Sequence, residues 1–323
     1  MQNLLEVKNL RTYFHTRGGV VKAVDNVSFN VGEGEMLGIV GESGSGKSVT
    51  ALSIMRLIPI PPGKIGEGSE IIFGGENVLD LTEDELHELR GGKISMIFQD
   101  PMTSLNPVFT VGFQIAEAVK LHLKLTGKAA EARTLEMMER VRIPDARRRL
   151  KSYPHEFSGG MRQRVMIAIA LACNPRLLIA DEPTTALDVT IQAQVLDLMK
   201  ALSSEFRTAV MLITHDLGVV AGMCQRVVVM YAGRVMEEAP TSRLFAKPAH
   251  PYTQALLRSI PHLEDNKTQR LNPIKGQPPD LVNLPPGCPF APRCVKAQAR
   301  CLVETPLLET VADEQRAACF YPF

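Results

Sequence analysis

The chain lacks an excess of charge of either sign. Its 323 residues include 36 lysines and arginines against 35 aspartates and glutamates, which leaves a formal net charge of +1. A protein that binds nucleic acid or an anionic membrane through bulk electrostatics carries a basic excess or a basic stripe. The sequence therefore predicts no nucleic-acid partner. With 45% hydrophobic and 22% charged residues, the composition is that of an ordinary globular protein.

Long apolar runs are also missing. The longest run, from Val165 to Cys173, has nine residues, whereas a membrane-spanning helix needs about 20. The first residues contain Glu6 and no apolar core, so they do not have the pattern of a signal peptide. We therefore expect a soluble, cytoplasmic chain that reaches a membrane only through partners.

Cysteines are few and unevenly placed. Cys173 and Cys224 stand singly in apolar surroundings, which is typical of small buried side chains. The other four crowd into the end of the chain at intervals of 5, 6 and 17 residues: Cys288, Cys294, Cys301 and Cys319. Without an export signal, such a cluster favours a metal over disulfides. Four thiolates suit zinc or an iron–sulfur cluster, and the paired C-x₂-C spacing of common zinc sites is absent.

A glycine-rich loop is the first positive signal. Met36 to Val40 is a short apolar strand, followed by Gly41-Glu42-Ser43-Gly44-Ser45-Gly46-Lys47-Ser48 and by an apolar helix from Lys47 to about Leu57. The loop fits G-x-x-x-x-G-K-[ST], in which backbone N–H groups surround phosphate oxygens. Lys47 would reach the β- and γ-phosphates, and Ser48 would bind Mg²⁺. We infer a nucleoside triphosphate site.

Two adjacent carboxylates follow the buried strand Leu177–Ala180. Ligands bind at the carboxyl ends of strands in open α/β sheets. Asp181 is placed to hold magnesium, and Glu182 to accept a proton from the attacking water. Taken alone, the pair also fits a surface turn or a helix N-cap.

Two further polar residues stand at strand ends. Gln99 follows Ile94–Phe98 and could contact magnesium and orient the lytic water, whereas His215 follows Val210–Thr214 and could donate to the γ-phosphate. A strand-end histidine by itself is more often structural than catalytic. A catalytic role for Gln99 and His215 is therefore supported only together with the other motifs.

Phe157-Ser158-Gly159-Gly160-Met161 opens an amphipathic helix. A serine N-cap followed by two glycines leaves N–H groups pointing outward, which makes an anion site at a helix start. The alternative is a simple helix start. We expect the anion to be the γ-phosphate of a nucleotide bound to a second subunit.

In this order, the motifs resemble those of the ATP-binding cassette family, the ATPases of ABC transporters, over roughly residues 4–260. Gly41–Ser48 matches the Walker A loop, Gln99 the Q-loop and Leu177–Glu182 Walker B. Ala186-Leu187-Asp188 matches the D-loop, His215 the switch histidine, and Phe157–Met161 the signature, with Phe157 and Met161 replacing the usual Leu and Gln. The resemblance implies that an aromatic residue near the N-terminus stacks on adenine; its distance from the Walker A loop favours Phe14, with Tyr13 as the alternative. It also implies ATP contacts from Gly41, Ser43, Gly44, Gly46, Lys47, Ser48, Val49, Ser158, Gly159, Gly160 and Asp188.

Other stretches are similar to the dipeptide/oligopeptide importers within that family. They are Gln99–Pro107, His250-Pro251-Tyr252-Thr253 and Gly287–Cys294. This resemblance implies ATP, Mg²⁺ and a [4Fe-4S] cluster on the four C-terminal cysteines, with zinc as the alternative. It implies a second, non-identical ATPase subunit, two transmembrane permeases and, indirectly, an extracellular or periplasmic binding protein, at the cytoplasmic face of the membrane. Nickel, glutathione or another small solute is an alternative cargo, and a soluble non-transport cassette ATPase or a regulatory nucleotide-binding module is an alternative class.

The expected fold is α/β, a P-loop NTPase core of the ABC ATPase kind. Residues 4–31 alternate as an antiparallel β start with a turn at Gly18-Gly19, and apolar residues recur at helical spacing between about 100 and 160. We expect a cassette over residues 1–260, with a helical subdomain at about 100–160. A small cysteine-rich, metal-clipped extension is expected over residues 261–323.

Overall fold

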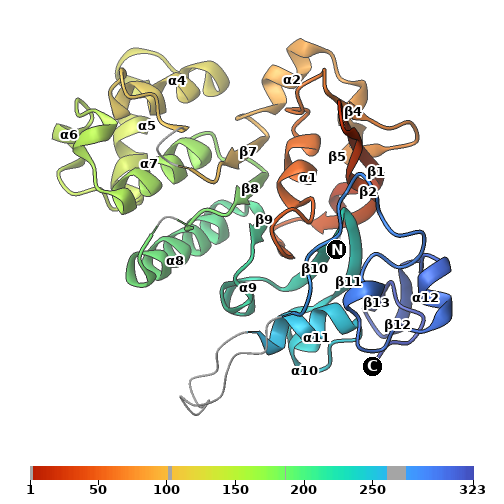
Figure 1. Ribbon diagram of the computed structural model, residues 1–323. Helices are drawn as coiled ribbons and strands as arrows, with labels where there is room; N and C mark the ends of the chain where they lie inside the picture. The colour runs from red at the N-terminus through yellow and green to blue at the C-terminus, as the bar shows by residue number, and fades with distance from the viewer. Residues whose placement is uncertain (1–2, 101–103, 186, 260–273) are drawn as a thin grey trace. The chain divides into compact units, whose positions relative to one another are not determined.

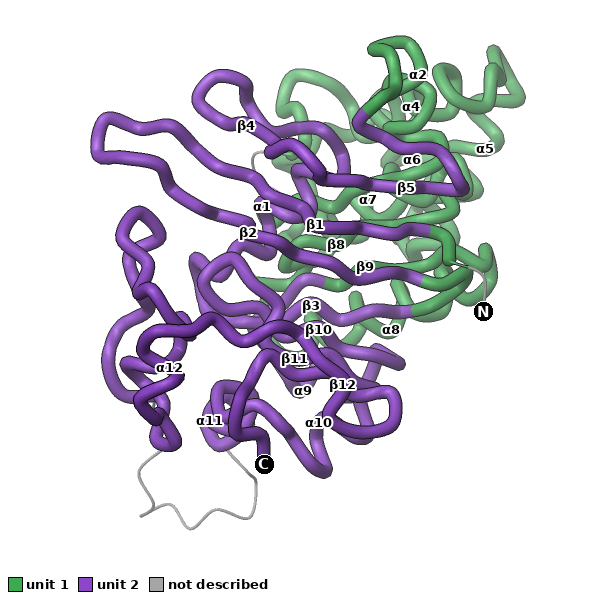
Figure 2. Tube along the Cα trace, turned by 90° about the vertical axis from the view of Figure 1, so that its right-hand side faces the viewer, with its two compact units in different colours: residues 1–4, 32–35, 80–212 green, residues 5–31, 36–79, 213–323 purple. Residues whose placement is uncertain are grey.

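The protein is known here from a computed structural model that describes residues 3–100, 104–185, 187–259 and 274–323. The chain divides into two compact units (Figure 2). The first comprises residues 1–4, 32–35 and 80–212, and the second comprises residues 5–31, 36–79 and 213–323. Each unit is therefore assembled from segments that are distant in the sequence.

The second unit begins with an antiparallel β segment. Strands β1 and β2 are hydrogen-bonded neighbours, as the alternating pattern predicted, and β1 also pairs antiparallel with β4 and β5. Strand β6 continues this sheet beyond β5. The inward side chains of this sheet, such as Leu5 and Val24, are fully buried. The strands are β1 (Asn3–Thr16), β2 (Gly19–Gly32), β4 (Gly63–Ile65), β5 (Glu70–Phe73) and β6 (Glu76–Asn77).

A second group of strands in this unit carries the glycine-rich loop. β3 (Met36–Val40) is buried at every position and pairs parallel with β10 (Arg226–Tyr231). A continuous apolar run is what a parallel strand covered on both faces requires. β10 then pairs antiparallel with β11 (Arg234–Pro240). The helices of this unit are α1 (Lys47–Ile54), α9 (Leu217–Met223), α10 (Thr241–Ala246) and α11 (Pro251–Arg258).

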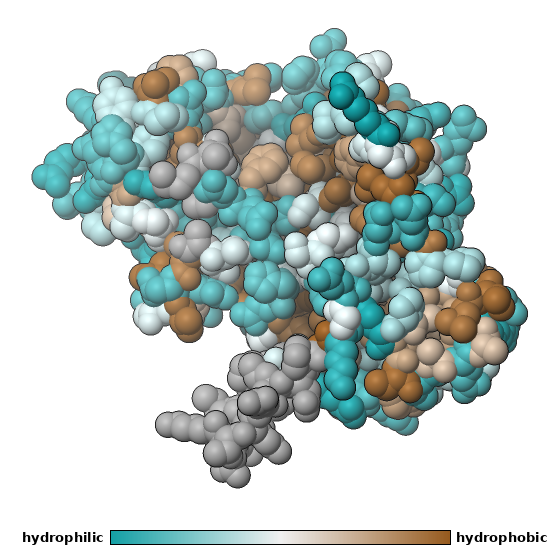
Figure 3. Space-filling view, in the orientation of Figure 1, coloured by the Kyte–Doolittle hydropathy of each residue, from teal (hydrophilic) through white to brown (hydrophobic). Residues whose placement is uncertain are grey.

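The C-terminal residues join this strand group. β13 (Gln315–Ala317) pairs antiparallel with β11, and β12 (Glu309–Ala312) pairs with β13. A short helix, α12 (Ala299–Val303), and the 3₁₀ turn Ala291–Arg293 complete the segment. This segment is the blue end of the chain in Figure 1. Figure 3, in the same orientation, shows apolar residues on its surface. Its exposed apolar side chains are Val295, Leu302, Val303, Leu307 and Phe323.

The first unit holds the strands that precede the predicted catalytic residues. β7 (Ile94–Ile97) pairs parallel with β8 (Leu177–Asp181). The neighbour of β8 on its other side is β9 (Ala209–Thr214), and the first four residues of β9 belong to this unit. Figure 1 shows α8 beside β8 and the helices α4 to α7 gathered together. The helices are α2 (Glu83–Leu89), α4 (Val111–Leu123), α5 (Gly127–Arg140), α6 (Ala146–Arg149), α7 (Gly159–Leu171) and α8 (Val189–Phe206).

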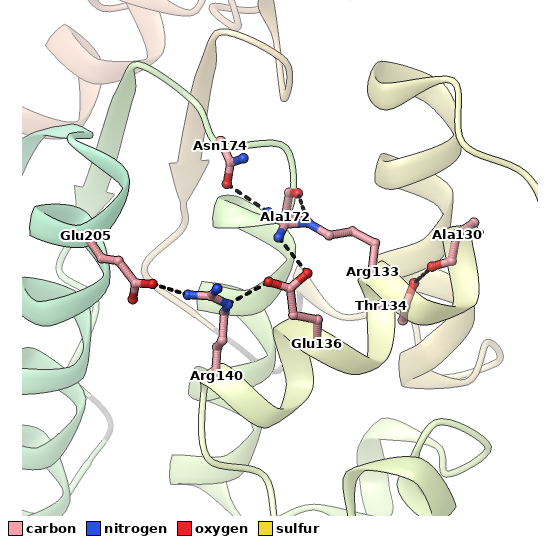
Figure 4. Close-up of polar contacts among 8 residues, drawn as sticks. All are labelled: Ala130, Arg133, Thr134, Glu136, Arg140, Ala172, Asn174 and Glu205. Carbon is pink, nitrogen blue, oxygen red and sulfur yellow. Dashed lines mark hydrogen bonds and ion pairs between the residues drawn. The ribbon is translucent and has the colours of Figure 1, made fainter. Parts of the chain in front are cut away.

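Charged side chains tie α5 to the rest of this unit (Figure 4). Arg133 donates to the carbonyl of Ala172 at 3.0 Å and to Asn174 at 2.8 Å, in the turn before β8. Glu136 accepts from both Arg133 and Arg140, and Arg140 also pairs with Glu205 on α8. The helical segment predicted for about 100–160 is thereby fixed to the strand that carries Asp181.

One helix is shorter than the sequence suggested. α1 ends at Ile54 rather than near Leu57, because Arg56 adopts a left-handed φ of 50° and prolines follow at 59, 61 and 62. Across the described residues, no helix has the length and apolarity that a membrane crossing demands.

Candidate nucleotide site

The glycine-rich loop connects β3 to α1 in the second unit. A Cβ atom at Gly41 would lie 2.2 Å from the carbonyl oxygen of Met230, and one at Gly46 would lie 2.3 Å from that of Ala23. Both glycines also have positive φ, 155° and 99°. Only glycine satisfies both the close approach and the dihedral angle, so the loop is fixed by its neighbours before any ligand arrives.

Lys47 is the first residue of α1 and is buried. Its Nζ donates to the carbonyls of Gly41 at 2.8 Å and Glu42 at 3.0 Å, so the ammonium group lies inside the turn of the loop. Ser43 and Gly44 are exposed at the tip. Ser48 and Val49 in the first turn of α1 are half-buried. A buried ammonium group inside a glycine-rich turn, at the start of a helix, is suited to bind a phosphate group.

The loop is also held from the C-terminal side of the chain, which the sequence did not reveal. Arg293 donates to both carboxylate oxygens of Glu42, at 2.6 and 3.0 Å. The backbone N–H of Glu42 donates to the hydroxyl of Tyr252 at 2.9 Å. Gly287–Cys294 and His250–Thr253, which stood out only by resemblance, therefore supply contacts to the phosphate loop.

In the first unit, the structure brings Gln99 and Glu182 together. The parallel register of β7 and β8 places Ile97 opposite Ala180, so the residues that follow both strands emerge at the same edge. The side-chain amide of Gln99 donates to the Glu182 carboxylate at 3.0 Å, and the Thr185 hydroxyl donates to the same oxygen at 2.9 Å. Asp181 is buried at the end of β8. Thr185 is therefore a further candidate site residue, which sequence reasoning missed.

Glu182 has an unusual backbone conformation. Its φ is 46°, in the left-handed region that a residue other than glycine adopts at a cost of about 1–3 kcal/mol. Such strain is typical of functional sites, where the surrounding contacts hold the residue in place. Here the two hydrogen bonds from Gln99 and Thr185 orient the carboxylate.

The predicted signature segment forms the start of α7. Ser158 is the N-cap, its Oγ faces the N–H of Met161 at 3.4 Å, and both Ser158 and Gly159 are exposed. A Cβ atom at Gly160 would lie 2.5 Å from the Cγ2 methyl of Ile191 on α8, so a larger residue would require the Ile191 side chain to shift. Asp188 caps α8 by accepting from Ile191 at 3.0 Å. Ala186 of the predicted D-loop lies outside the described residues, as do Pro101, Met102 and Thr103.

The remaining predicted residues lie in the second unit. His215 is exposed directly after β9. Phe14 and Tyr13 are adjacent on β1 and half-buried, and a Cβ atom at Gly63 would lie 3.3 Å from the ring of Phe14. The hydroxyl of Tyr13 donates to Asp25 at 2.6 Å. Burial and this hydrogen bond raise the pKa of Tyr13 to about 12, so its hydroxyl stays protonated and held by Asp25.

The site residues are divided between the two units. Phe14, Lys47, Ser48 and His215 belong to the second unit, and Gln99, Asp181, Glu182, Ser158, Gly160 and Asp188 belong to the first. Within the second unit the phosphate loop is complete. The first unit contains Gln99, the carboxylates of Asp181 and Glu182, and the exposed start of α7 at Ser158.

The four C-terminal cysteines line one small cavity, of about 20 Å³, together with Phe290 and His250. Burial raises the pKa of Cys288 to about 11 and also raises the pKa of Cys294 and of Cys319. The thiols thus converge in apolar surroundings. Among the residues that the structure describes, however, no group of three or more His, Cys, Asp or Glu side chains is placed to hold a metal ion, so the expected metal site is not formed there.

Two families match the sequence. Residues 24–185 match the ABC transporter family, and residues 236–301 match the C-terminal region of oligopeptide/dipeptide transporters. The first match includes the phosphate loop, Gln99, the signature and Asp181-Glu182. The second includes the region of Tyr252, Arg293 and three of the four cysteines.

Similar proteins span nearly the whole chain. An oligopeptide transport ATP-binding protein of Bacillus subtilis is 53% identical over 320 residues, which cover 99% of this chain and 97% of that protein. One of Salmonella typhimurium is 52% identical over 319 residues, 99% of this chain and 94% of that protein. A solved dimeric ATP-binding cassette bound to ADP and phosphate, in a post-hydrolysis state, is 31% identical with a TM-score of 0.65, over 73% of this chain and 98% of its own.

Proposed function

The chain belongs to the ATP-binding subunits of oligopeptide/dipeptide ABC transporters, and from this membership we propose that it hydrolyses ATP to drive the import of di- and oligopeptides. The observation that carries the proposal is the combination of a complete phosphate loop with the Gln99–Glu182 pair. The similarity over nearly the full length to proteins named for oligopeptide transport supports peptides as the cargo.

The chemistry follows from the residues in each unit. The amides of Gly41–Ser48 and the ammonium group of Lys47 bind the β- and γ-phosphates. Ser48, Asp181 and Gln99 offer a hydroxyl, a carboxylate and an amide oxygen, the hard donors that Mg²⁺ prefers. When bound, the ion neutralises charge on the phosphates. Glu182 takes a proton from the attacking water, and His215 donates to the γ-phosphate.

We place the second half of each site on another subunit. Ser158 and Gly159 are exposed at the start of a 13-residue helix, where backbone N–H groups and the helix dipole favour an anion. In the proposed pair, Ser158, Gly159, Gly160 and Asp188 contact the nucleotide held by the partner's phosphate loop, and Phe14 stacks on adenine within its own chain. The partner ATPase is a second, non-identical subunit of the same kind.

The permeases are proposed to dock on the helical segment of the first unit. A groove among α4, α5 and α6 is lined by Phe113, Ala116 and Lys120 of α4, by Ala130 of α5 and by Arg147 and Arg148 of α6. At its edge Phe113 is half-exposed and stacks on Phe109 at 4.8 Å. Exposed aromatic side chains beside a groove suit an apolar cytoplasmic segment of a membrane protein. This docking, at the cytoplasmic face, would give the chain its peripheral place in an importer.

For the C-terminal part we propose a small cysteine-rich domain, residues 261–323, attached to a cassette of residues 1–260 and clipped by a metal. Cys288, Cys294, Cys301 and Cys319 share one apolar cavity, as the ligands of a [4Fe-4S] cluster or of zinc would. The segment exposes several apolar side chains and has little core of its own. Metal binding would supply the missing folding energy.

Two experiments test these proposals. Cells that lack this chain should regain uptake of a labelled tripeptide when complemented with the wild type but not with Lys47→Ala, and uptake of nickel and glutathione should stay at the level of the deletion strain. Restored nickel or glutathione uptake without peptide uptake would contradict the peptide assignment. Retained peptide uptake with Lys47→Ala would contradict an ATP-driven role.

The metal is tested on the purified full-length chain by metal analysis and visible absorption. An iron–sulfur cluster gives iron, acid-labile sulfide and visible absorption, whereas zinc gives none of these. Cys294→Ser should lose the metal, and Cys173→Ala, which removes a buried cysteine outside the cluster, should keep it. A wild-type chain without stoichiometric metal would refute the proposal that a bound metal stabilises the C-terminal domain.

A further inference from the structure

Arg293 connects the C-terminal segment to the phosphate loop through several side-chain hydrogen bonds. Its side chain is only 4% exposed and makes two bonds to the Glu42 carboxylate. It also donates to the hydroxyl of Tyr231 at 3.2 Å and to the backbone carbonyl of Lys275 at 3.1 Å. A planar guanidinium with parallel bonds to one carboxylate fixes both the distance and the orientation of that carboxylate.

The partner of Arg293 is part of the phosphate loop. Glu42 is the second residue of that loop, and its carbonyl oxygen is one of those that accept from Lys47, at 3.0 Å. Tyr252 accepts from the N–H of Glu42, so the residue is held at its carboxylate and at its backbone. Because these contacts converge on one residue of the loop, they restrict the conformation of the amides that would surround the phosphates.

Arg293 is in turn positioned by the cysteine-lined segment. It immediately precedes Cys294 and ends the 3₁₀ turn Ala291–Arg293. Phe290 stands one residue before that turn. The centroid of its ring lies 5.3 Å from that of Tyr231 and 5.2 Å from that of Tyr252, and Phe290 also lines the cavity of the cysteines. Arg293 and Phe290 therefore link the cysteine cavity to the phosphate loop through a single packed cluster.

We propose that Arg293 is a positioning residue for the phosphate loop, through which the C-terminal segment sets the affinity of this chain for ATP. The proposal rests on the nucleotide site of the proposed function and not on the identity of any metal. Without Arg293, the Glu42 carboxylate would be left unpaired on a loop that must bind a triphosphate. The loop would lose its anchor and gain a repulsive charge, and both changes weaken ATP binding.

A double-mutant cycle on the full-length chain tests this. In a Glu182→Gln background, which limits hydrolysis during the measurement, Arg293→Ala should raise the Kd for Mg·ATP roughly tenfold. Glu42→Ala should raise it less, because the charge that then lacks its carboxylate partner is the Arg293 cation, which does not repel a triphosphate. In the presence of Glu42→Ala, the further change Arg293→Ala should have no effect. Arg293→Lys should lie between wild type and Arg293→Ala, because lysine keeps the charge and loses the two parallel bonds.

Controls separate this role from a general loss of structure. Arg300→Ala removes an exposed arginine of the same segment, which pairs with Glu304 at 2.8 Å, and should leave the Kd unchanged. If Arg293→Ala fails to fold, Glu42→Gln removes the ion pair from the other side and should still weaken ATP binding.

Two results would overturn the inference: an unchanged Kd in Arg293→Ala, or an equal effect of Arg293→Ala with and without Glu42. A parent protein that does not bind ATP would refute the proposed function instead.

Discussion

The side-chain amide of Gln99 donates a 3.0 Å hydrogen bond to the carboxylate of Glu182, across 83 residues of sequence. The bond joins the residue at the entrance of the helical segment to the proposed catalytic base. A movement of that segment would therefore alter the orientation of the carboxylate. This gives a direct physical route by which the proposed docking on the helices would change the rate of hydrolysis.

Replacing Gln99 tests that link. Gln99→Ala should lower kcat for ATP hydrolysis by about 10- to 100-fold, in the range seen when a group that orients a catalytic ligand is lost, with little change in KM. Steady-state ATPase assays check this. Gln194→Ala, which removes a glutamine that pairs with Arg164 in the same unit, serves as the control and should keep the wild-type rate. A normal kcat in Gln99→Ala would show that the bond has no role in the reaction.

Glu237 should be a major determinant of stability in the second unit. It is fully buried on β11 and accepts from the N–H groups of Ala249 and His250 and from the side chain of Gln315, each at 2.8 Å. Glu237→Ala leaves three donors without their acceptor, which should lower the free energy of unfolding by about 3 kcal/mol or more. Urea unfolding measures the loss. Glu304→Ala, which removes an exposed carboxylate, should cost less than about 1 kcal/mol.

Asp25 predicts a dependence of stability on pH. Burial alone would raise its pKa, but hydrogen bonds from Tyr13 and Arg234 outweigh burial and hold the pKa below its ordinary value. Below about pH 4 the unfolded state therefore binds a proton that the folded state does not, and stability falls as the pH falls. The difference in unfolding free energy between wild type and Asp25→Asn should be largest near neutral pH and should shrink below about pH 4. A difference that grows on acidification would contradict this.

The parts of the site that sequence predicted are those with a local signature. β3 and β8 are short apolar runs, and the loop after β3 has its glycines at fixed spacing, so their structure follows from a few neighbouring residues. The meeting of Gln99 and Glu182 could be expected as well, because each follows a buried strand and parallel strands align their carboxyl ends.

Long-range contacts had no such signature. Arg293 and Glu42 are 251 residues apart, and nothing near either residue indicates the other. The strands β12 and β13 were not predicted, because each is only three or four residues long and their pairing with β11 is set by tertiary contacts. The choice between Phe14 and Tyr13 for adenine stacking stays a prediction.

The most direct test of Glu182 as the general base is the rate of ATP turnover by Glu182→Gln in the assembled transporter. The carboxylate acts mainly in the transition state, so the variant should bind Mg·ATP as tightly as the wild type while kcat falls by about 100-fold or more. A variant that keeps a kcat close to that of the wild type would remove Glu182 from the role of general base and contradict the proposed mechanism.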